Sequence, residues 1–575
     1  MEEEKTIFSA EAKDEELLTT FVKWKKESEQ YHNELLKYQK ISEQYYLGNQ
    51  TSRDRIPDYL SNTVENRIFE AVETIVPVVT AAAHSFQVMP GSKDEKSIQR
   101  ADKLQKLLRR KYETLLMQEK LEEITRHLLL YRFGVLKVFW NKKIDDLDVK
   151  VIDPRLMYFP KLRVKPNDLP YKMEVQEYTQ AEFEEEFPDA DPNALIKEMV
   201  DTGSNEKNER IHRLFEIWTP DTVAWIGGGV VVKKMQTPYY DYEGEEQPEG
   251  SATPLKFYNH FDLPRDPYII FTTYNVSEGP VGAVSLAEVA IPIQDAINVQ
   301  KRQIIDNLRR LGNGRMIIDS EAMSEEEAGN ITDEPGGYIL GKGAASEGRV
   351  KVENGIALSN AHFANLTHSE NVFDNVTGVH SATRGAAAAK TLGQDILSRQ
   401  QDFTRIDLIT RVLNRGVDET ANWIVQLVKL FYTENHVVKM IGEQEAVEFV
   451  ELNRTDVDDF IEIIVKSGAD LPMDRVSLRT EAVQLWQLGA LDPVTLFERL
   501  GFAEPSEVAQ KLLAWKQGQL SMETNARIQE AQAGAAVRAQ TPTSEATRSA
   551  GRGTETPANV LQRARANVGG TAPTR

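Results

Sequence analysis

The clearest pattern near the start of the chain is a stripe of large apolar residues between positions 14 and 47. These residues recur every three or four positions with charged residues between them, which predicts an amphipathic helix that ends at Gly48. The stripe consists of Leu17, Phe21, Trp24, Tyr31, Leu35, Tyr38 and Tyr45. Similar spacing predicts helices at about 62–85, where Pro77 would introduce a kink, and at about 94–133.

Residues 135–275 contain short runs of β-branched and aromatic residues, which predict strands. The polar turn Asn141-Lys-Lys separates the first two runs, and the triple glycine at 227–229 predicts a hairpin turn. The acidic stretch from Glu182 to Asp191 predicts a solvated surface helix and loop. The five runs lie at 135–140, 147–152, 216–218, 223–226 and 230–232.

A second long amphipathic helix is predicted at 286–311, where Gly312 ends an apolar stripe with helical spacing. Pro292 either kinks this helix or marks its start. The stripe consists of Leu286, Val289, Ile293, Ile297, Ile304, Leu308 and Leu311.

Residues 312–358 differ sharply from the helix before them, because they are rich in glycine and hold two short β runs, 316–318 and 350–352. Ser359 is placed to cap a returning helix at 359–377. A helix out, a compact β module and a helix back would place the module at the far end of a paired helical stalk.

The rest of the chain alternates small-residue, helical and β-type segments. Small residues dominate 378–392, a long helix is predicted at 393–432, strands at 436–466 and short helices at 475–517. Residues 518–575 contain seven Arg, four Glu and no Phe, Tyr, Trp or Lys, which predicts a disordered tail whose first part could be helical. The chain as a whole is predicted to have a helix-rich α+β fold.

Composition narrows the possible functions. The 575 residues include 68 Lys+Arg, 89 Asp+Glu and no cysteine, for a net charge of −21. The missing cysteine excludes disulfides, thiolate metal sites and thiol nucleophiles. The sequence contains no run of 18 apolar residues, so it predicts no membrane-spanning helix. The acidity argues against a protein that coats nucleic acid with a basic surface, but not against one that lets nucleic acid slide past.

A search for enzymatic chemistry finds little. Residues 336–343 nearly fit the phosphate-binding loop pattern, but Gly343 replaces the hydroxyl residue that would hold Mg²⁺. His362 and His368 are six positions apart, which is the wrong spacing for metal ligands on one helix face. We therefore predict no catalytic residues, no metal site and no cofactor.

Basic residues on the predicted 286–311 helix are the more informative candidates. They can form a solvated face with ion pairs to Asp295 and Asp306, or a ring of positive charge that contacts passing phosphates. The second interpretation names Lys301, Arg302, Arg309 and Arg310 on the helix, with Arg384 and Lys390 around the small-residue segment.

Several segments, in their order along residues 14–517, resemble the portal proteins of tailed double-stranded DNA bacteriophages. Each segment is similar to a motif of that family, in the order in which the family has them. They correspond to the opening helix, the second helix, the strand and turn that follow it, the approach to the stem, and a helix near the C-terminus. They are Tyr45-Tyr-Leu-Gly-Asn-Gln50, Asn62-Thr-Val-Glu-Asn66 with Val72-Glu-Thr-Ile-Val-Pro77, Val151-Ile-Asp-Pro154, Ser277-Glu-Gly-Pro280 and Asp492-Pro-Val-Thr-Leu-Phe-Glu-Arg-Leu-Gly501.

The resemblance implies a portal fold with a wing, a paired-helix stem, a small β-rich clip and a helical crown, assembled as a ring. Its parts would be the wing at 1–285, stem helices at 286–311 and 359–377, the clip at 312–358, a channel loop at 378–392, a long helix and strands returning to the wing at 393–466, the crown at 467–517 and a tail at 518–575, which is a barrel helix or disordered.

The resemblance also implies a role and partners. A dodecameric ring at one capsid vertex would pass double-stranded DNA without sequence preference while a terminase large subunit pumps it. It would later dock head–tail adaptor and tail proteins, and contact the major capsid and scaffolding proteins. The ring would assemble in the host cytoplasm and remain in the virion, without a membrane. Clip docking would use Arg315, Lys342, Arg349 and Lys351.

Two other classes remain open at this stage. One is a metal-dependent nuclease or processing enzyme with a β insert, which needs clustered carboxylates around Mg²⁺. The other is a different ring-forming virion adaptor, which the length of 575 residues disfavours because such adaptors are usually far shorter.

Overall fold

The computed structural model divides the chain into two compact units, Met1–Leu478 and Arg479–Arg575. None of the helices in the described part of the chain is long and apolar enough to cross a membrane. The structure describes residues 8–50, 60–80, 84–191, 211–244, 256–276, 279–312, 315–318, 326, 350–353, 357–379, 392–433, 436–441, 447–454, 457, 461–467, 479, 482–500 and 508–516.

Helix α1 (Asp14–Tyr46) confirms the amphipathic helix predicted at the start of the chain. Leu17, Phe21 and Leu35 on its apolar stripe are buried against the strands that follow in sequence. Gly48, with φ of +81°, allows the chain to turn immediately after the helix, in a backbone conformation that glycine adopts without strain.

The second predicted helix is shorter than the sequence pattern indicates. Helix α2 (Arg67–Thr80) contains Pro77 and ends before strand β1 (His84–Met89), so the prediction of helix up to position 85 is wrong. β1 pairs antiparallel with β14 (Glu462–Ser467), a partner more than 370 positions later in the chain. This long-range pairing selects a strand where local periodicity favours a helix.

The helix predicted at 94–133 is two helices, α3 (Glu95–Thr114) and α4 (Met117–Tyr131). The break lies at Leu116, whose φ of +51° is incompatible with a continuous right-handed helix. The Lys120 ammonium donates a hydrogen bond to the Leu115 carbonyl (2.6 Å) and so satisfies one carbonyl that the end of α3 leaves without a helical partner.

Two antiparallel sheets form the strand-rich region. The order β3-β2-β9 gives a three-stranded sheet, and β4 to β8 follow each other in a five-stranded meander. Gly228 and Gly229, with φ of +58° and +82°, form the predicted turn between β7 and β8. The strands are β2 (Phe133–Asn141), β3 (Asp146–Ile152), β4 (Met157–Tyr158), β5 (Lys172–Thr179), β6 (Ile211–Trp218), β7 (Thr222–Gly227), β8 (Val230–Gln236) and β9 (Tyr268–Thr272).

Three short helices accompany these sheets. The acidic stretch forms α5 (Gln180–Glu186), which Thr179 and Glu182 close with a capping box. Its charged side chains face solvent as predicted, whereas Phe183 is fully buried and attaches the helix to the sheet. The two 3₁₀ turns are η2 (Pro154–Leu156) and η3 (Pro166–Asp168).

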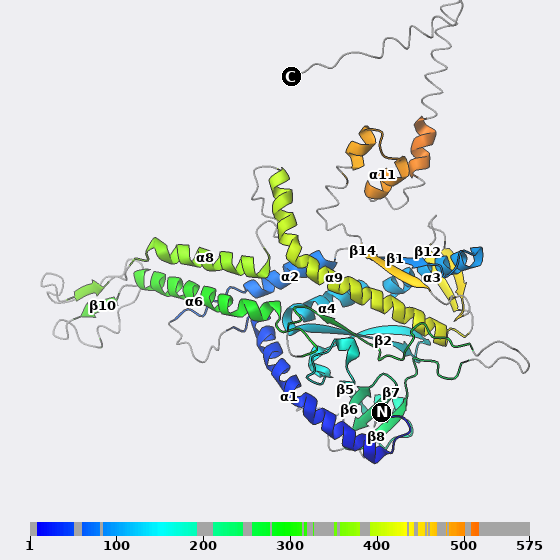
Figure 1. Ribbon diagram of the computed structural model, residues 1–575. Coiled ribbons are helices and arrows are strands. Elements are labelled where there is room, and N and C mark those ends of the chain that lie inside the picture. Colours follow the sequence, from blue (N-terminus) through cyan, green and yellow to red (C-terminus); the bar gives the residue numbers. More distant parts are fainter. Residues whose placement is uncertain are drawn as a thin grey trace, which may run out of the picture. The chain divides into compact units, whose positions relative to one another are not determined.

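A helical hairpin and a long helix follow the sheets (Figure 1). Pro292 lies inside α6, so it does not mark the start of that helix. Ser359 occupies the N-cap position of α8 as predicted, although its side chain does not bond to the first-turn backbone. The elements are α6 (Leu286–Gly312), β10 (Arg315–Ile318), β11 (Val350–Glu353), α8 (Asn360–Thr377), α9 (Leu392–Phe431), β12 (His436–Ile441) and β13 (Val447–Leu452).

The unit Arg479–Arg575 contains helix α11 (Pro493–Leu500). The Asp492 carboxylate accepts a hydrogen bond from the Thr495 backbone N–H (3.0 Å), which is the N-cap predicted at Asp492-Pro493. The tail at 518–575 lies outside the described residues.

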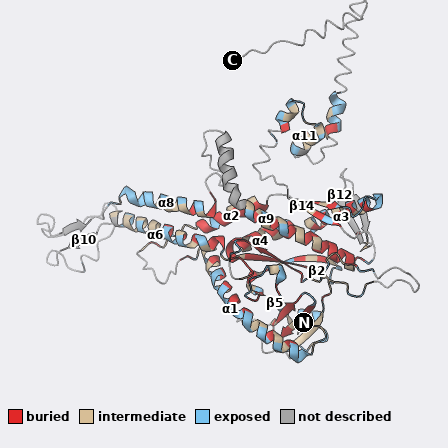
Figure 2. Cartoon of the chain, in the orientation of Figure 1, coloured by how far each residue is buried: buried red, intermediate tan, exposed pale blue. Residues whose placement is uncertain are grey.

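The main hydrophobic core of the larger unit joins α2, α4, β2, β9 and α9 (Figure 2). The packing is close where α9 crosses β9, because a Cβ on Gly416 would lie only 1.9 Å from the Phe271 ring. No side chain larger than hydrogen fits there without moving the helix or the strand. The core therefore fixes α9 against the three-stranded sheet.

A buried charge network joins the two sheets. The Lys137 ammonium on β2 donates to Glu174 on β5 (2.8 Å) and to Glu216 on β6 (2.5 Å). The Lys172 ammonium donates to both carboxylate oxygens of Asp266 (2.7 Å each). Burial opposes ionisation of Glu174, but the Lys137 charge and the hydrogen bonds from Lys137 and Tyr268 together outweigh it and lower the pKa of Glu174, whereas burial raises the pKa of Glu216.

His127 on α4 is a buried group that ties stability to pH. Burial lowers its pKa to about 4, because the folded protein disfavours the imidazolium. The unfolded chain binds a proton at an ordinary pKa of about 6.5. Stability is therefore fully present above pH 6.5 and is lost as pH falls from 6.5 to 4, because only the unfolded chain gains a proton in that interval.

We expect replacement of His127 by Gln to remove this loss. Relative to the variant, the natural chain should lose about 3 kcal/mol of unfolding free energy between pH 6.5 and pH 4. Chemical denaturation at pH 7.5, 5.5 and 4.5 measures the difference, and exposed His368→Gln serves as the matched control. Parallel pH dependence in the natural chain and the His127 variant would contradict the prediction.

Candidate nucleic-acid interface

The hairpin of α6 and α8 carries most of the described basic candidates. Gln300 on α6 donates to the Ser369 hydroxyl on α8 (3.0 Å), and Lys301 pairs with Glu370 (3.4 Å). Only Phe373 and Thr377 of α8 are buried, and they lie at the end of the helix nearest the core (Figure 2). The hairpin therefore meets the body of the subunit at one end and presents most of α8 to its surroundings.

A row of polar residues attaches α6 to segment 61–67, which leads into the first residue of α2. Gln294, Asn298, Arg302 and Asp306 are spaced four residues apart and lie on one side of the helix. Each forms a hydrogen bond with the segment's backbone, at alternate residues. The bonds are Arg67 N to Gln294 Oε1 (3.1 Å), Glu65 N to Asn298 Oδ1 (3.2 Å), Arg302 Nε to Thr63 O (3.1 Å) and Ser61 N to Asp306 Oδ1 (2.6 Å).

Two backbone periods make this arrangement possible. Four residues of α-helix rise about 6 Å, and two residues of extended chain advance about 6.6 Å. At 65–67 the segment is tighter, because the Arg67 N–H also donates to the Glu65 carbonyl (3.0 Å). Alternate backbone groups of the segment therefore meet every fourth side chain of α6, and the two run antiparallel. We call the four side chains and segment 61–67 the polar ladder. Gln294 and Asn298 are almost completely buried in it (0% and 2% exposed).

Further polar contacts hold the start of α6 and the neighbouring part of α8. At its start, the Arg132 guanidinium donates two hydrogen bonds to Glu288 (2.7 and 2.6 Å). Beside the ladder, Arg67 donates to Asp374 on α8 (2.7 Å) and lies over the Phe373 ring. Bidentate and charge-assisted bonds of this kind restrict rotation as well as separation. The helix is thus held in one rotational setting relative to the sheets.

The structure places Lys301 and Arg302 in contacts within the subunit. Lys301 lies between Glu65 and Glu370, and Arg302 is part of the polar ladder. Nearby, burial raises the pKa of Tyr45, as does its hydrogen bond to Asp295 (2.7 Å). Asp295 thus accepts its hydrogen bond from Tyr45, whereas Lys301 pairs with Glu65 and Glu370 and Arg302 donates to the Thr63 carbonyl.

Arg309 is the most exposed described cation of this group. Its side chain is 53% exposed and makes a long ion pair with Asp306 (3.8 Å), one of the two pairs that the sequence suggested. An exposed pair at this distance contributes little stability. Arg310 is the next residue of α6, and the structure gives its backbone position only. This end of α6 is where a cation can turn to an external phosphate at least cost.

The remaining candidates divide into two groups. Arg315 and Lys351 lie in the antiparallel pair β10–β11, where Arg315 is opposite Glu353 and Lys351 is opposite Ile317. This pair confirms the two short β runs predicted from the sequence. The candidates Lys342, Arg349, Arg384 and Lys390 lie outside the described residues, as do the glycines at 336–343.

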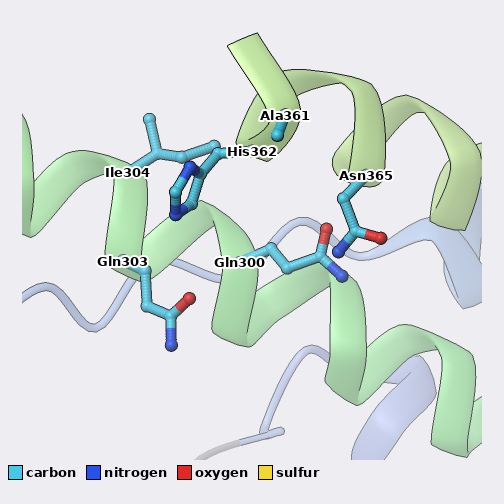
Figure 3. Close-up of a pocket in the computed structure, with 6 residues that line it drawn as sticks. All are labelled: Gln300, Gln303, Ile304, Ala361, His362 and Asn365. Carbon is cyan, nitrogen blue, oxygen red and sulfur yellow. The ribbon is translucent and has the colours of Figure 1, made fainter. Parts of the chain in front are cut away.

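A pocket of about 230 Å³ lies between α6 and α8 (Figure 3). Gln300 and Gln303 line it from α6, and His362 and Asn365 line it from α8. The lining residues are Gln300, Gln303, Ile304, Ala361, His362 and Asn365. Its lining offers hydrogen-bonding groups but no nucleophile activated by a neighbouring base.

No metal centre is formed among the residues that the structure describes, where no group of three or more His, Asp or Glu side chains could hold an ion. His362 and His368 both lie on exposed turns of α8. What the described residues do form is a helical hairpin, α6 and α8, which is fixed to the body at one end and carries basic side chains such as Arg309.

The polar ladder was not predicted from the sequence. Gln294 and Asn298 interrupt an apolar stripe at a spacing of four, next to the fully buried Ile297. These two amides on the core-facing side of a predicted helix could have indicated a polar contact, because buried amides require hydrogen-bond partners. The partner segment 61–67 has no periodicity of its own and could not have been inferred.

Comparison with solved structures gives many similar chains, among them two from gene transfer agent particles. One comes from "Virion of native gene transfer agent (GTA) particle", with 13% identity, a TM-score of 0.36, and coverage of 73% of this chain and 85% of that one. The other comes from "Neck of native GTA particle computed with C12 symmetry", with 12% identity, a TM-score of 0.36, and coverage of 74% and 85%. No curated protein sequence matches significantly.

Comparison with protein families confirms the resemblance seen in the motifs. The model of the family described as "Phage P22-like portal protein" matches residues 253–555, just over half of the chain. The matched region contains α6, α8, α9 and α11. The chain therefore belongs to the phage P22-like portal protein family, whose members are structural virion components rather than enzymes, and this membership implies an oligomeric ring around a DNA channel at a capsid vertex.

Proposed function

We propose that this chain forms a dodecameric ring at one capsid vertex, through which double-stranded DNA is packaged and later ejected. The observation that carries the proposal is the α6–α8 hairpin, which bears the strand pair β10–β11 and lies inside the region matched to the portal family. A hairpin anchored at one end suits a channel wall, because copies arranged around an axis can lie side by side while their free ends reach beyond the body.

The proposed parts follow the element boundaries. The stem helices at 286–311 and 359–377 correspond to α6 and α8, and the clip at 312–358 contains β10 and β11. The wing at 1–285, joined by 393–466, holds the two sheets and α9. The crown at 467–517 contains α11, a channel loop lies at 378–392, and the tail at 518–575 completes the chain.

DNA contact in the stem is assigned to Arg309 and Arg310. Lys301 and Arg302 would have to leave intramolecular partners to reach a phosphate, whereas Arg309 gives up only a long, exposed ion pair. Each additional cation–phosphate contact adds salt-dependent affinity, so few contacts favour sliding. The net charge of −21 supports this view, because an acidic wall repels the DNA backbone and keeps the duplex near the axis.

The clip is the proposed docking face for the terminase large subunit, and afterwards for head–tail adaptor and tail proteins. Short edge strands such as β10 and β11 pair readily with a neighbouring chain. Arg315, Lys342, Arg349 and Lys351 supply positive charge to this face. The major capsid and scaffolding proteins are proposed partners of the ring during assembly in the host cytoplasm.

Electron microscopy of the purified full chain tests the ring directly. We expect a closed ring with twelve-fold symmetry and a central hole. A monodisperse monomer at micromolar concentration would overturn the proposal.

Charge reversal of Arg309 and Arg310 tests the stem contact. We expect the double variant Arg309→Glu, Arg310→Glu to form rings and to reduce packaged DNA severalfold, because the variant replaces attraction to phosphates by repulsion. The control is Lys37→Glu with Lys40→Glu, the same charge change on exposed residues of α1. Normal packaging in the Arg309/Arg310 variant would remove these residues from the DNA path.

Deletion of residues 312–358 tests the clip. We expect loss of stable rings or of terminase docking, since the deletion removes both strands of the β10–β11 pair. Sedimentation reports ring formation, and co-purification with terminase reports docking. Unchanged packaging by the deletion variant would contradict this assignment.

A further inference from the structure

Helix α6 has three sides, and in the described part of the chain two of them are covered within the subunit. The polar ladder covers one side, and α8 covers a second through contacts to Gln300 and Lys301 (3.0 and 3.4 Å). At about 100° per residue, the third side lies about 120° from each of the others. Its five residues are uncharged and exposed, and they follow one another at steps of three, four, three and four residues, the spacing of a seam that packs against another helix. They are Val289, Pro292, Ala296, Val299 and Gln303.

Helix α8 contributes a matching row to the same side of the hairpin. Ala361, Asn365 and His368 are exposed and Val372 is half-buried, and these four residues follow one another at steps of four, three and four. The α6–α8 pocket lies between the two rows, because Gln303 of α6 and Ala361 and Asn365 of α8 all line it (Figure 3). The two rows and the pocket therefore form one surface without Asp, Glu, Lys or Arg, which we call the pocket face.

The opposite side of α8 presents an aromatic residue. Phe363 is 47% exposed and lies two positions from both Ala361 and Asn365, which is about 200° around the helix and about 3 Å along it. Its neighbours one turn away, Asn360 and Thr367, are exposed and uncharged. Phe363 therefore points away from the pocket face at the same level of the hairpin.

Rotational symmetry would bring these two sides together. Membership in the portal family implies an oligomeric ring. In a closed ring each subunit meets one neighbour with one side and the other neighbour with a different side. Copies related by rotation lie at the same height, so a stem hairpin that runs along the ring axis would hold its Phe363 level with the pocket of the next copy.

We propose that Phe363 of each copy inserts into the α6–α8 pocket of the next copy and so joins adjacent stem hairpins. The inference rests on the proposed ring and deepens it by naming the two surfaces that meet. In another protein a cavity of about 150 Å³ holds benzene, so a pocket of about 230 Å³ has room for a phenyl ring.

The lining of the pocket suits an aromatic ring. Ile304 and Ala361 offer apolar contact, the His362 ring is itself aromatic, and the side-chain amides of Gln300 and Asn365 are planar. None of the lining residues is Asp, Glu, Lys or Arg, so insertion of a ring removes no full charge of these types from water. The exposed phenylalanine leaves water at the same time, which favours association.

Disulfide cross-linking tests the contact directly, because the natural chain has no cysteine. The double variant Phe363→Cys, Gln303→Cys places one thiol on each of the two surfaces. After oxidation of assembled rings we expect covalent multimers larger than dimers on a non-reducing denaturing gel. Each single variant should remain monomeric on that gel, because in a head-to-tail contact a surface does not meet its own copy.

Removal of the phenyl ring tests its contribution to assembly. We expect Phe363→Ala to raise the concentration at which rings dissociate about tenfold, since each contact loses the burial of one aromatic side chain. Phe69→Ala is the matched control, because Phe69 on α2 is exposed to the same extent, 47%. Rings of the control should dissociate within about twofold of the natural concentration, as expected for a surface substitution outside the contact.

A second variant blocks the pocket and leaves Phe363 in place. In Ala361→Phe the larger side chain would occupy the pocket of its own copy, so ring dissociation should shift in the same direction as in Phe363→Ala. Positions 361 and 363 are both exposed, so the subunit should keep its fold, which circular dichroism of each variant checks.

The mass of the natural chain in solution reports separately on the ring. Rings of natural stability in Phe363→Ala, or rings of the double cysteine variant that yield no multimers, would overturn the pocket contact but not the proposed ring. Dimers formed by Phe363→Cys alone would overturn it in favour of a contact between identical surfaces. A natural chain that stays monomeric would refute the ring and with it this contact.

Discussion

The structure depends on one constraint. Helix α6 is held to the body of the subunit along a side that buries the amides of Gln294 and Asn298 as well as apolar groups, so these amides need hydrogen-bond partners there. The polar ladder meets this constraint. Gln294 and Asn298 would be costly to bury without partners, by about 1–3 kcal/mol for each unsatisfied group. Segment 61–67 supplies the partners from its backbone. Because a hydrogen bond is directional, the ladder fixes the rotation and the axial position of α6, which apolar contacts alone would leave adjustable.

That constraint explains how the cations of α6 are divided. Arg302 donates to the Thr63 carbonyl within the ladder, and Lys301 pairs with Glu65 and Glu370. Their charge is therefore neutralised or directed inward. Arg309 lies beyond the last ladder residue and keeps an exposed side chain. A helix that carries four cations in sequence therefore offers fewer to an external ligand. Charge counted along a sequence overstates charge on a surface wherever buried backbone groups need donors.

Local patterns predicted the elements whose periodicity and end signals agree. The helices α1, α6 and α9, the β7–β8 turn at Gly228 and the cap at Asp492 are of this kind. The break at Leu116 was not predictable, because neither Gly, Pro nor Asn marks it, and Lys120, which donates to the Leu115 carbonyl, is an ordinary helix residue. Strand β1 was missed because its partner β14 is remote in sequence. In the candidate site, sequence named the cations but not their partners, which lie on segment 61–67 and α8.

The ladder also bears on which positions of this chain can vary. All four ladder side chains belong to α6, and at segment 61–67 they meet backbone N–H and C=O groups, which nearly every residue type possesses. Asn62, Thr63 and Val64 can therefore be exchanged without losing a rung, provided that the backbone keeps its path. Exchange of Asn298 for an apolar residue of equal size, by contrast, would remove the acceptor for the Glu65 N–H. The side chains that specify this contact therefore belong almost entirely to α6.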